Sequence, residues 1–285
     1  MPLITTQEIV DHAHRSGCGV AAFNVITLEH AEAIVAGAER AGAAVILQIS
    51  QNAVKFHHGR VGPIAAASAA VAAAGRVPVS LHLDHVEEEG LLRQAADAGF
   101  SSVMYDASTL DYEANVAATR AAADWAHRQG LWVEGELGEV GGKGGAHAPG
   151  VRTRPPEACQ FVEATGVDAL AVAVGSSHAM TSRSACLDHA LIEELRQAVP
   201  VPLVLHGSSG VPDEELARGV AAGLVKINIG TALNIAFTGA VRQYLAADDR
   251  VVDPRKYTAS GRDAMAAAVA RLLGVLASAH VAKAL

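Results

Sequence analysis

The feature of this 285-residue chain that most constrains its fold is a regular alternation of short apolar runs with longer alanine-rich runs. The short runs have the length and β-branched content of buried strands, and the longer runs have helical periodicity. Strands are expected at residues 19–24, 43–49, 79–84, 101–105, 131–137, 168–174, 201–206 and 225–229. The main helices are expected at residues 28–41, 65–74, 87–98, 112–128, 156–165, 187–198, 213–221 and, after a linker at 247–261, 262–279. Eight β–α repeats predict an α/β fold, a (β/α)8 or TIM barrel, as a single domain over residues 1–285 with extra helices at both ends.

Composition narrows the class of protein. Hydrophobic residues make up 51% of the chain and aromatic residues only 4%, so the core must be built from Ala, Val, Leu and Ile, as in parallel sheets that helices cover. The net charge of −8 argues against a nucleic-acid partner. No apolar run is long enough to span a bilayer, so no membrane partner is expected. Three widely spaced cysteines without a CxxC pair, and an N-terminus without the pattern of a signal peptide, indicate a cytoplasmic protein.

Polar or ionisable residues follow every one of the eight expected strands. These residues are Asn24, Ser50, Asp84 with His85, Asp106, Glu136, Ser176 to His178, His206 to Ser209, and Asn228. A barrel of parallel strands gathers its carboxyl ends on one face, where the active sites of such barrels lie. The pattern therefore predicts a polar active site at that face.

Three of these strand-end residues are histidines, namely His85, His178 and His206. Three imidazoles that converge on one face can hold a zinc ion and leave its fourth position open. Asp84 would then place a carboxylate beside the metal, as a general acid and base or as a group that fixes a histidine tautomer. His82 alternates with His85 along the strand and is expected to have a structural or orienting role.

Two further carboxylates have two interpretations each. Asp106 and Glu136 either serve as further ligands or hold an accessory cation, or they form salt bridges inside the barrel. A long glycine-rich segment at residues 138–156 has the length and composition of a lid or binding loop.

Two small-residue segments indicate a phosphate site. Gly-Ser-Ser-Gly at residues 207–210 follows strand seven, and Asn-Ile-Gly-Thr at 228–231 follows strand eight. In (β/α)8 barrels these two loops, with a helix N-terminus, often bind phosphate through backbone N–H and hydroxyl groups. A local phosphate site would let an acidic protein take an anionic substrate.

The joint pattern of short motifs resembles the class II, zinc-dependent ketose-bisphosphate aldolases over nearly the whole chain. The motifs are Ala-Phe-Asn at 22–24, Leu-His-Leu-Asp-His at 81–85, Glu-Gly-Glu-Leu-Gly at 134–138, Ser-His at 177–178, Leu-His-Gly-Ser-Ser-Gly at 205–210, Lys-Ile-Asn at 226–228 and Asp-Pro-Arg-Lys-Tyr at 253–257. The resemblance is to the branch that holds tagatose- and fructose-bisphosphate aldolases. It implies a carbon–carbon lyase of carbohydrate metabolism that cleaves a ketose 1,6-bisphosphate reversibly to dihydroxyacetone phosphate and an aldehyde, usually glyceraldehyde 3-phosphate.

The same resemblance implies roles for individual residues. His85, His178 and His206 would bind zinc as a Lewis acid, Asp84 would move the proton of the C4 hydroxyl, and Asn228 would hold the enediolate. The substrate- and phosphate-binding residues would be Asn24, Ser50, Ala179, Gly207, Ser208, Ser209, Gly230, Thr231 and Arg262. A monovalent cation, Na⁺ or K⁺, is a further implied cofactor. Arg262 would reach the aldehyde-end phosphate of a neighbouring subunit, which implies a homodimer or homotetramer.

Departures from the family pattern keep other functions open. The segment Gly-Gly-Lys-Gly-Gly at 141–145 lacks the usual carboxylate, and Ala179 stands where the family usually has glycine. Gly230 replaces the aspartate of many fructose-type members, which favours the tagatose-like branch. The alternatives are an aldolase for another phosphorylated ketose, and a non-catalytic partner subunit. A zinc hydrolase on the same barrel is disfavoured, because the first strand lacks the His-x-His pair that such hydrolases often carry.

Overall fold

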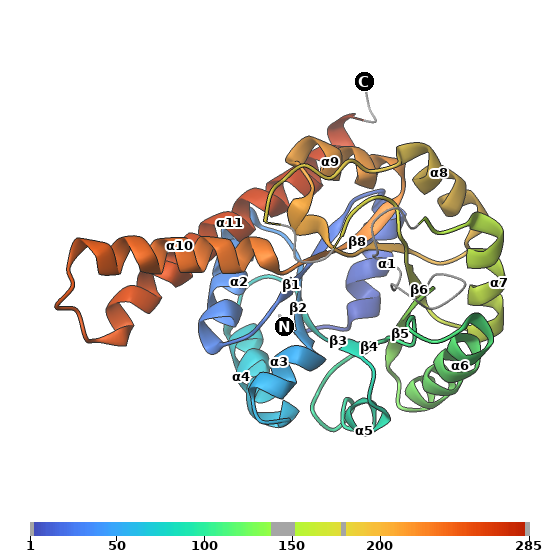
Figure 1. Cartoon of the computed structure of the whole chain (residues 1–285), viewed down its shortest axis with the longest axis horizontal. Helices are drawn as coiled ribbons and strands as arrows, with labels where there is room; N and C mark the ends of the chain where they lie inside the picture. The colour runs from blue at the N-terminus through green and yellow to red at the C-terminus, as the bar shows by residue number, and fades with distance from the viewer. Residues whose placement is uncertain (1–2, 138–151, 178–180, 283–285) are drawn as a thin grey trace.

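A computed structural model describes residues 3–137, 152–177 and 181–282 of the chain. Within these ranges, eight parallel strands close in sequence order into a barrel, with β1 hydrogen-bonded to β8 (Figure 1). The strands are β1 (Val20–Asn24), β2 (Val45–Ser50), β3 (Val79–Val86), β4 (Ser102–Tyr105), β5 (Trp132–Glu136), β6 (Ala169–Ala171), β7 (Leu203–Leu205) and β8 (Leu224–Ile229). The prediction of a (β/α)8 barrel is confirmed.

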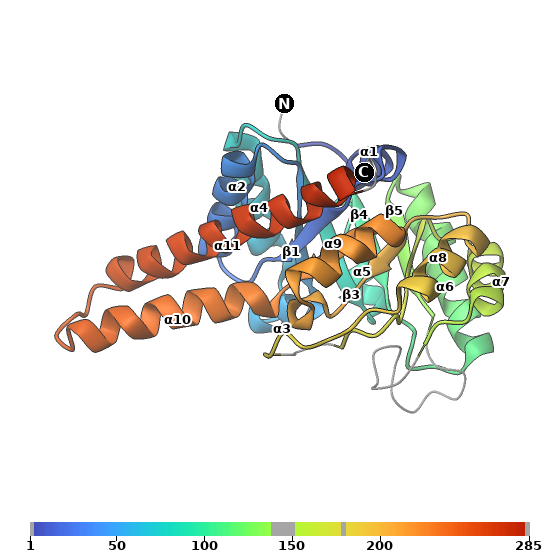
Figure 2. The same cartoon turned by 90° about the horizontal axis from the view of Figure 1, so that it is seen from above.

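Helices surround this barrel. They are α1 (Thr6–Ser16), α2 (Leu28–Ala41), α3 (Gln51–Phe56), α4 (Val61–Ala74), α5 (Glu89–Leu92), α6 (Tyr112–Arg128), α7 (Pro155–Thr165), α8 (His189–Ala198), α9 (Asp213–Ala222), α10 (Thr231–Ala247) and α11 (Pro254–Ala282). Helices α10 and α11 lie side by side and extend together away from the barrel (Figure 2). Across the described residues, no helix combines the length and apolar character needed to cross a membrane.

Two predicted helix boundaries were wrong. The last helix begins at Pro254 rather than at residue 262, because Asp253 caps its first turn by accepting the Arg255 N–H, and a proline is well suited to the first helical position. The helix expected at 87–98 is confined to Glu89–Leu92. Beyond Leu92 the backbone tightens into turns, in which Gln94 and Ala95 donate to carbonyls three residues earlier.

The apolar residues form two separate cores. The larger one fills the space between the sheet and the outer helices, and includes Leu47, Leu83 and Ile227. The smaller one joins Ile9 and Val10 of α1 to inward-facing residues of several strands. Helix α1 therefore closes the amino-terminal end of the barrel, and the lumen above this apolar floor is free to carry polar side chains.

The contact between α2 and α11 depends on Gly37. A Cβ added there would lie 2.6 Å from both the carbonyl oxygen of Ala266 and Cβ of Val269. We expect Gly37→Ala to lower the free energy of unfolding by about 1–3 kcal/mol through overpacking, measured by urea denaturation. Gly274 of α11 is the matched control, because an added Cβ would meet nothing within 4 Å. Gly274→Ala should be neutral or stabilising by up to about 1 kcal/mol. Equal effects of the two substitutions would contradict the close-packing argument.

Candidate active site

A cavity of about 730 Å³ opens at the carboxyl ends of the strands. Most of the residues predicted from the strand ends line it. These are Asn24, Ser50, Asp84, His85, Asp106, Glu136, Gly207, Ser208, Ser209, Asn228, Gly230 and Thr231. Residues up to 207 positions apart in the sequence, from Asn24 to Thr231, thus surround one space. The closed parallel barrel supplies the reason, because it brings all eight carboxyl ends to one face.

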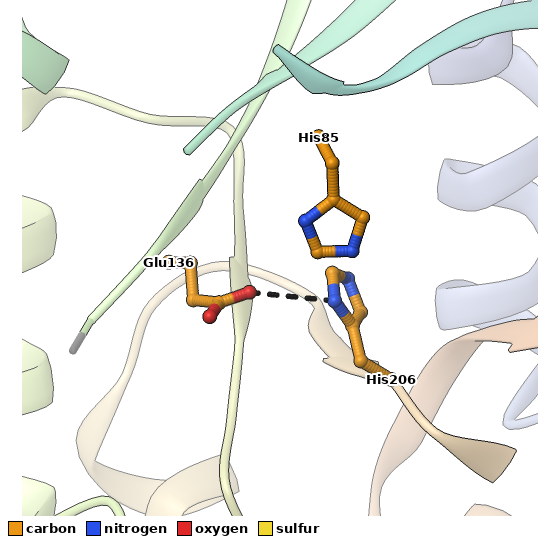
Figure 3. A group of neighbouring side chains, drawn as sticks. All are labelled: His85, Glu136 and His206. Carbon is orange, nitrogen blue, oxygen red and sulfur yellow. Dashed lines mark ion pairs between the residues drawn. The ribbon is translucent and has the colours of Figure 1, made fainter. Parts of the chain in front are cut away.

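A candidate metal-binding group lies at this cavity. One ligand atom from each of His85, Glu136 and His206 lies within 4.8 Å of the others (Figure 3). Nδ1 of His206 is 3.4 Å from Oε2 of Glu136, and the rings of His85 and His206 meet edge to face with their centroids 4.8 Å apart. Two imidazoles and a carboxylate suit a transition metal such as zinc. The predicted ligand His178, and Ala179, lie outside the described residues.

His85 faces the cavity because strand β3 is irregular at that point. Asp84 and His85 are consecutive, so in a regular strand they would point to opposite faces of the sheet. The pairing of β3 with β4 shifts register between Leu83 and Val86, and His85 has a φ of +47°. A positive φ at a non-glycine residue is strained by roughly 1–3 kcal/mol, and such residues are common at functional sites. The irregularity brings both side chains to the same cavity.

Carboxylates surround His85 and set its electrostatics. Nδ1 of His85 lies 2.7 Å from Oδ2 of Asp106, and the other oxygen of Asp106 accepts hydrogen bonds from the backbone N–H and hydroxyl of Ser108. Burial disfavours the charged imidazole, but the carboxylates of Asp84, Asp106 and Glu136 outweigh it and raise the pKa of His85 to about 10. A site with this much negative charge favours a cation. Of the two interpretations of Asp106, its position favours the ion pair, because it pairs with His85, and a carboxylate in that place can orient a histidine that binds a metal.

Asp84 is almost fully buried at the end of β3. Its oxygens lie 3.3 Å from Nε2 of Gln48 and 3.5 Å from Nδ2 of Asn228. Burial is the largest effect on this carboxyl group and raises its pKa, although the positive charges of His85 and Lys226 oppose the rise. A carboxyl group held by donors at the edge of a cavity, with a raised pKa, can both accept and return a proton.

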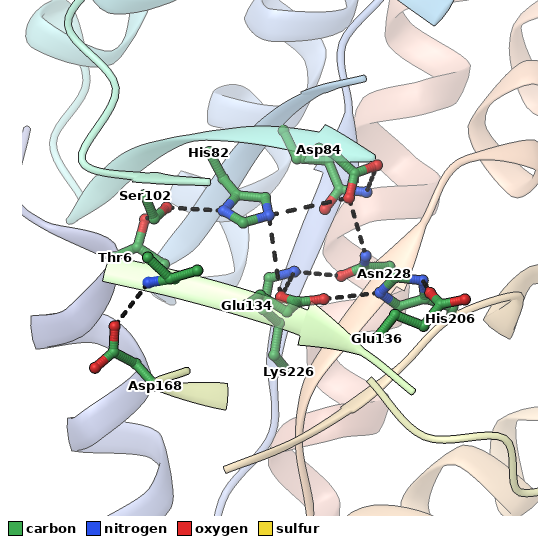
Figure 4. A network of polar contacts seen from close by, with 12 residues as sticks. Thr6, His82, Asp84, Ser102, Glu134, Glu136, Asp168, His206, Lys226 and Asn228 are labelled. Atoms are coloured by element: carbon green, nitrogen blue, oxygen red, sulfur yellow. Dashed lines mark hydrogen bonds and ion pairs between the residues drawn. The ribbon is translucent and has the colours of Figure 1, made fainter. Parts of the chain in front are cut away.

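A network of buried polar side chains lies beneath the cavity (Figure 4). Glu134 connects His206 to Lys226 in this network. Its Oε1 is 2.8 Å from Nε2 of His206, and its Oε2 is 2.7 Å from Nζ of Lys226. Lys226 also donates to Oδ1 of Asn228 at 2.7 Å. His82 is 2.8 Å from the Ser102 hydroxyl, and burial holds its pKa well below the usual value, so it remains neutral.

Sequence reasoning missed Gln48, Glu134 and Lys226 as site residues. Each is fully or almost fully buried, and each lies inside a buried strand next to apolar residues, as in Val-Ile-Leu-Gln-Ile-Ser at 45–50 and Leu-Val-Lys-Ile-Asn-Ile at 224–229. A polar residue in the middle of a buried strand must find partners in the lumen. That signal was present in the sequence.

The two segments predicted to bind phosphate, residues 207–210 and 228–231, meet at the rim of the cavity. Ser209 accepts a hydrogen bond from the backbone N–H of Ala232, in the first turn of α10. Gly230 precedes that helix, and a Cβ there would lie 2.8 Å from Oδ1 of Asn24, so a larger residue at position 230 would require the Asn24 side chain to shift. Ser208 is buried and its hydroxyl donates to the carbonyl of Asn228, so this hydrogen bond connects the 207–210 segment to strand β8.

Arg262 lies apart from the residues that line the cavity. It is on α11, where its Nη1 is 2.8 Å from Oε2 of Glu32, and its side chain is 41% exposed. Of the predicted substrate- and phosphate-binding residues in the described ranges, it is the one that does not line the cavity.

Known proteins share this sequence pattern and this fold. A family model described as "Fructose-bisphosphate aldolase class-II" matches residues 4–281. A fructose-bisphosphate aldolase from Geobacillus stearothermophilus is 40% identical over 272 residues, which cover 94% of this chain and 95% of that protein. Among solved structures, the YdjI aldolase from Escherichia coli K12 is 30% identical with a TM-score of 0.83, over 97% of this chain and 98% of that chain. A fructose-bisphosphate aldolase from Campylobacter jejuni, 24% identical over 96% of this chain and 95% of that one, shares the fold with a TM-score of 0.84.

Proposed function

Because the chain belongs to the class II fructose-bisphosphate aldolase family, whose members are carbon–carbon lyases, we propose that it reversibly cleaves a ketose 1,6-bisphosphate, fructose- or tagatose-1,6-bisphosphate. The products are dihydroxyacetone phosphate and glyceraldehyde 3-phosphate. The observation that carries the proposal is the convergence of a His/Glu ligand group, a buried carboxyl group and a carboxamide in one cavity, beside the two segments predicted to bind phosphate.

The donor set fits a zinc ion. His85, His178 and His206 would hold it, with Glu136 within reach of the same position. When bound, zinc supplies a Lewis acid that polarises the C2 carbonyl of the substrate. The cavity side chains of Asp84 and Asn228 carry the remaining steps.

In the cleavage direction, the Asp84 carboxylate accepts the proton of the C4 hydroxyl. The C3–C4 bond breaks, its electron pair moves to the ketone fragment as an enediolate, and the C4 oxygen becomes the aldehyde carbonyl. The enediolate then takes up a proton from water at C3, which gives dihydroxyacetone phosphate. The Nδ2 group of Asn228 donates a hydrogen bond to the enediolate. In condensation, Asp84 returns its proton to the new C4 hydroxyl.

The two substrate ends bind at different elements. The hydroxyls of Ser209 and Thr231 and the backbone N–H groups of Gly207 and Gly230 hold the ketone-end phosphate, where the N-terminus of α10 adds favourable partial charge. Ser50, with Asn24 nearby, contacts the aldehyde half of the substrate. The Arg262 of a neighbouring subunit completes the site, so the enzyme is a homodimer or homotetramer. A monovalent cation, Na⁺ or K⁺, assists phosphate binding.

The wider assignment follows from the same activity. We place the enzyme in the cytoplasm and in carbohydrate metabolism. If fructose 1,6-bisphosphate is the substrate, the pathway is glycolysis. We take residues 1–285 as one domain. Neither nucleic acid nor membrane is a partner.

One observation favours a second candidate, an aldolase for a ketose with a single phosphate. In the described part of the chain, no lysine or arginine lines the cavity, while the carboxylates of Asp84, Glu87, Asp106 and Glu136 do. A second phosphate would therefore need a cation from elsewhere, such as Arg262 of a neighbouring subunit.

The test is parallel cleavage of fructose 1,6-bisphosphate, tagatose 1,6-bisphosphate and fructose 1-phosphate, with and without EDTA and added zinc. Turnover of a bisphosphate that EDTA abolishes and zinc restores supports the proposal and identifies the preferred configuration at C4. Turnover of the monophosphate alone would replace it with the second candidate. Tight zinc binding without turnover of any sugar would contradict both.

A further inference from the structure

Lys226 is a fully buried lysine in the middle of strand β8, below the floor of the cavity. Its ammonium group lies 2.7 Å from Oε2 of Glu134 and 2.7 Å from Oδ1 of Asn228. Removing an ammonium group and a carboxylate from water is expensive, and well-packed apolar residues at such positions are often as stable or more stable. Stability is therefore a weak explanation for this ion pair.

The chemistry of the ammonium group fixes the orientation of Asn228. A lysine ammonium donates three hydrogen bonds and accepts none, so only the oxygen of the Asn228 carboxamide can face it. The NH₂ group must then point the other way, where Nδ2 lies 3.5 Å from Oδ1 of Asp84. Without Lys226 the carboxamide could rotate by half a turn and present its oxygen to Asp84 and the substrate.

Glu134 extends the same constraint to His206. One oxygen of Glu134 accepts from Lys226, and the other is 2.8 Å from Nε2 of His206. A carboxylate only accepts, so Nε2 carries a hydrogen, and Nδ1, on the Glu136 side of the ring, is the nitrogen left to bind a metal in the neutral imidazole. Both side chains of the ion pair are fully buried, so water does not compete for these bonds.

We propose that Lys226 is a positioning residue, which orients the Asn228 carboxamide directly and sets the tautomer of His206 through Glu134. This inference rests on the proposed function, because the roles of Asn228 and His206 come from it. Lys226 itself does not line the cavity and touches no substrate.

The test measures the effect of Lys226→Met twice, once in the otherwise unchanged chain and once in a chain that already carries Asn228→Ala. Lys226→Gln is made as well, because it retains a donor and is more easily folded while it loses the charge. Ser80→Ala is the matched control, since it removes a fully buried hydrogen bond with Thr6 at the amino-terminal end of the barrel. For every variant, kcat, KM and zinc affinity by competition with a chelator are measured.

In the natural background we expect both Lys226 variants to lower kcat by about 10- to 100-fold and to weaken zinc binding by a similar factor, the range typical of residues that orient metal ligands. In the Asn228→Ala background, with zinc at saturation, the further loss of kcat should be much smaller, because the residue that Lys226 orients directly has been removed. The weakening of zinc binding should persist there, because the route through Glu134 to His206 is intact. Ser80→Ala should leave kcat and zinc affinity unchanged.

Equal losses of kcat in the two backgrounds, or unchanged zinc affinity in both Lys226 variants, would overturn the inference. Its failure is distinguishable from failure of the proposed function. If wild type cleaves none of the three sugars, the function is wrong, while zinc affinity of the variants still tests the positioning role.

Discussion

Replacing Asp84 with asparagine should lower kcat for bisphosphate cleavage by about 10²- to 10⁴-fold, the contribution typical of a positioned general acid and base. Asparagine retains the shape of the side chain, and its carboxamide can still meet Gln48 and Asn228, but it cannot accept the C4 hydroxyl proton. KM should change little, because the phosphate-binding loops are untouched. Steady-state kinetics of cleavage, with zinc content measured on the same samples, would check this result.

Asp168→Asn is the matched control for this substitution. Asp168 precedes β6 at the opposite end of the barrel, where its carboxylate accepts from the backbone N–H of Val133 at 2.7 Å and lies 2.9 Å from Nε2 of His127. The same chemical change there should reduce stability and leave kcat near wild type. A comparable loss of kcat in both variants would show that Asp84 acts through stability rather than through proton transfer.

Removing the metal should have an equally large effect. A bound metal ion contributes several kcal/mol of stabilisation to a developing negative charge. Dialysis against a chelator should therefore lower activity by at least about 10³-fold. His206→Ala should prevent restoration by zinc, because it removes a proposed ligand and leaves the buried carboxylate of Glu134 with one partner fewer. Zinc titration by calorimetry and cleavage assays on the same preparations would measure both effects.

His127→Ala is the control for the metal experiment. His127 pairs with Asp168 far from the cavity, and its side chain is 41% exposed. That variant should bind zinc and recover activity as wild type does. Full activity of the natural enzyme after complete chelation would contradict the metal-dependent function.

Much of this fold was predictable because it follows from local patterns. The apolar runs, such as residues 169–174 and 203–205, are buried on both faces of the sheet, so they appear in the sequence as continuous hydrophobic stretches. Polar residues at the carboxyl ends of those runs had to meet on one face of a closed barrel. The final helix was misplaced because the capping signal at Asp253 and Pro254 was overlooked, although the sequence contained it.

The barrel, the face on which the polar strand ends gather and the family all follow from local patterns in the amino-acid sequence. The different roles of those strand ends depend on contacts between distant parts of the chain. Asp106 and Glu136 look alike in the sequence, yet Asp106 pairs with His85 while Glu136 joins the ligand group, because their strands enter the rim at different points around it. Asp84 and His85 share the cavity because β3 breaks its alternation after Leu83, which depends on the pairing with β4. The Glu134–Lys226 ion pair links β5 to β8, strands that are not neighbours in the sheet, and no local pattern can pair residues that meet only across a lumen.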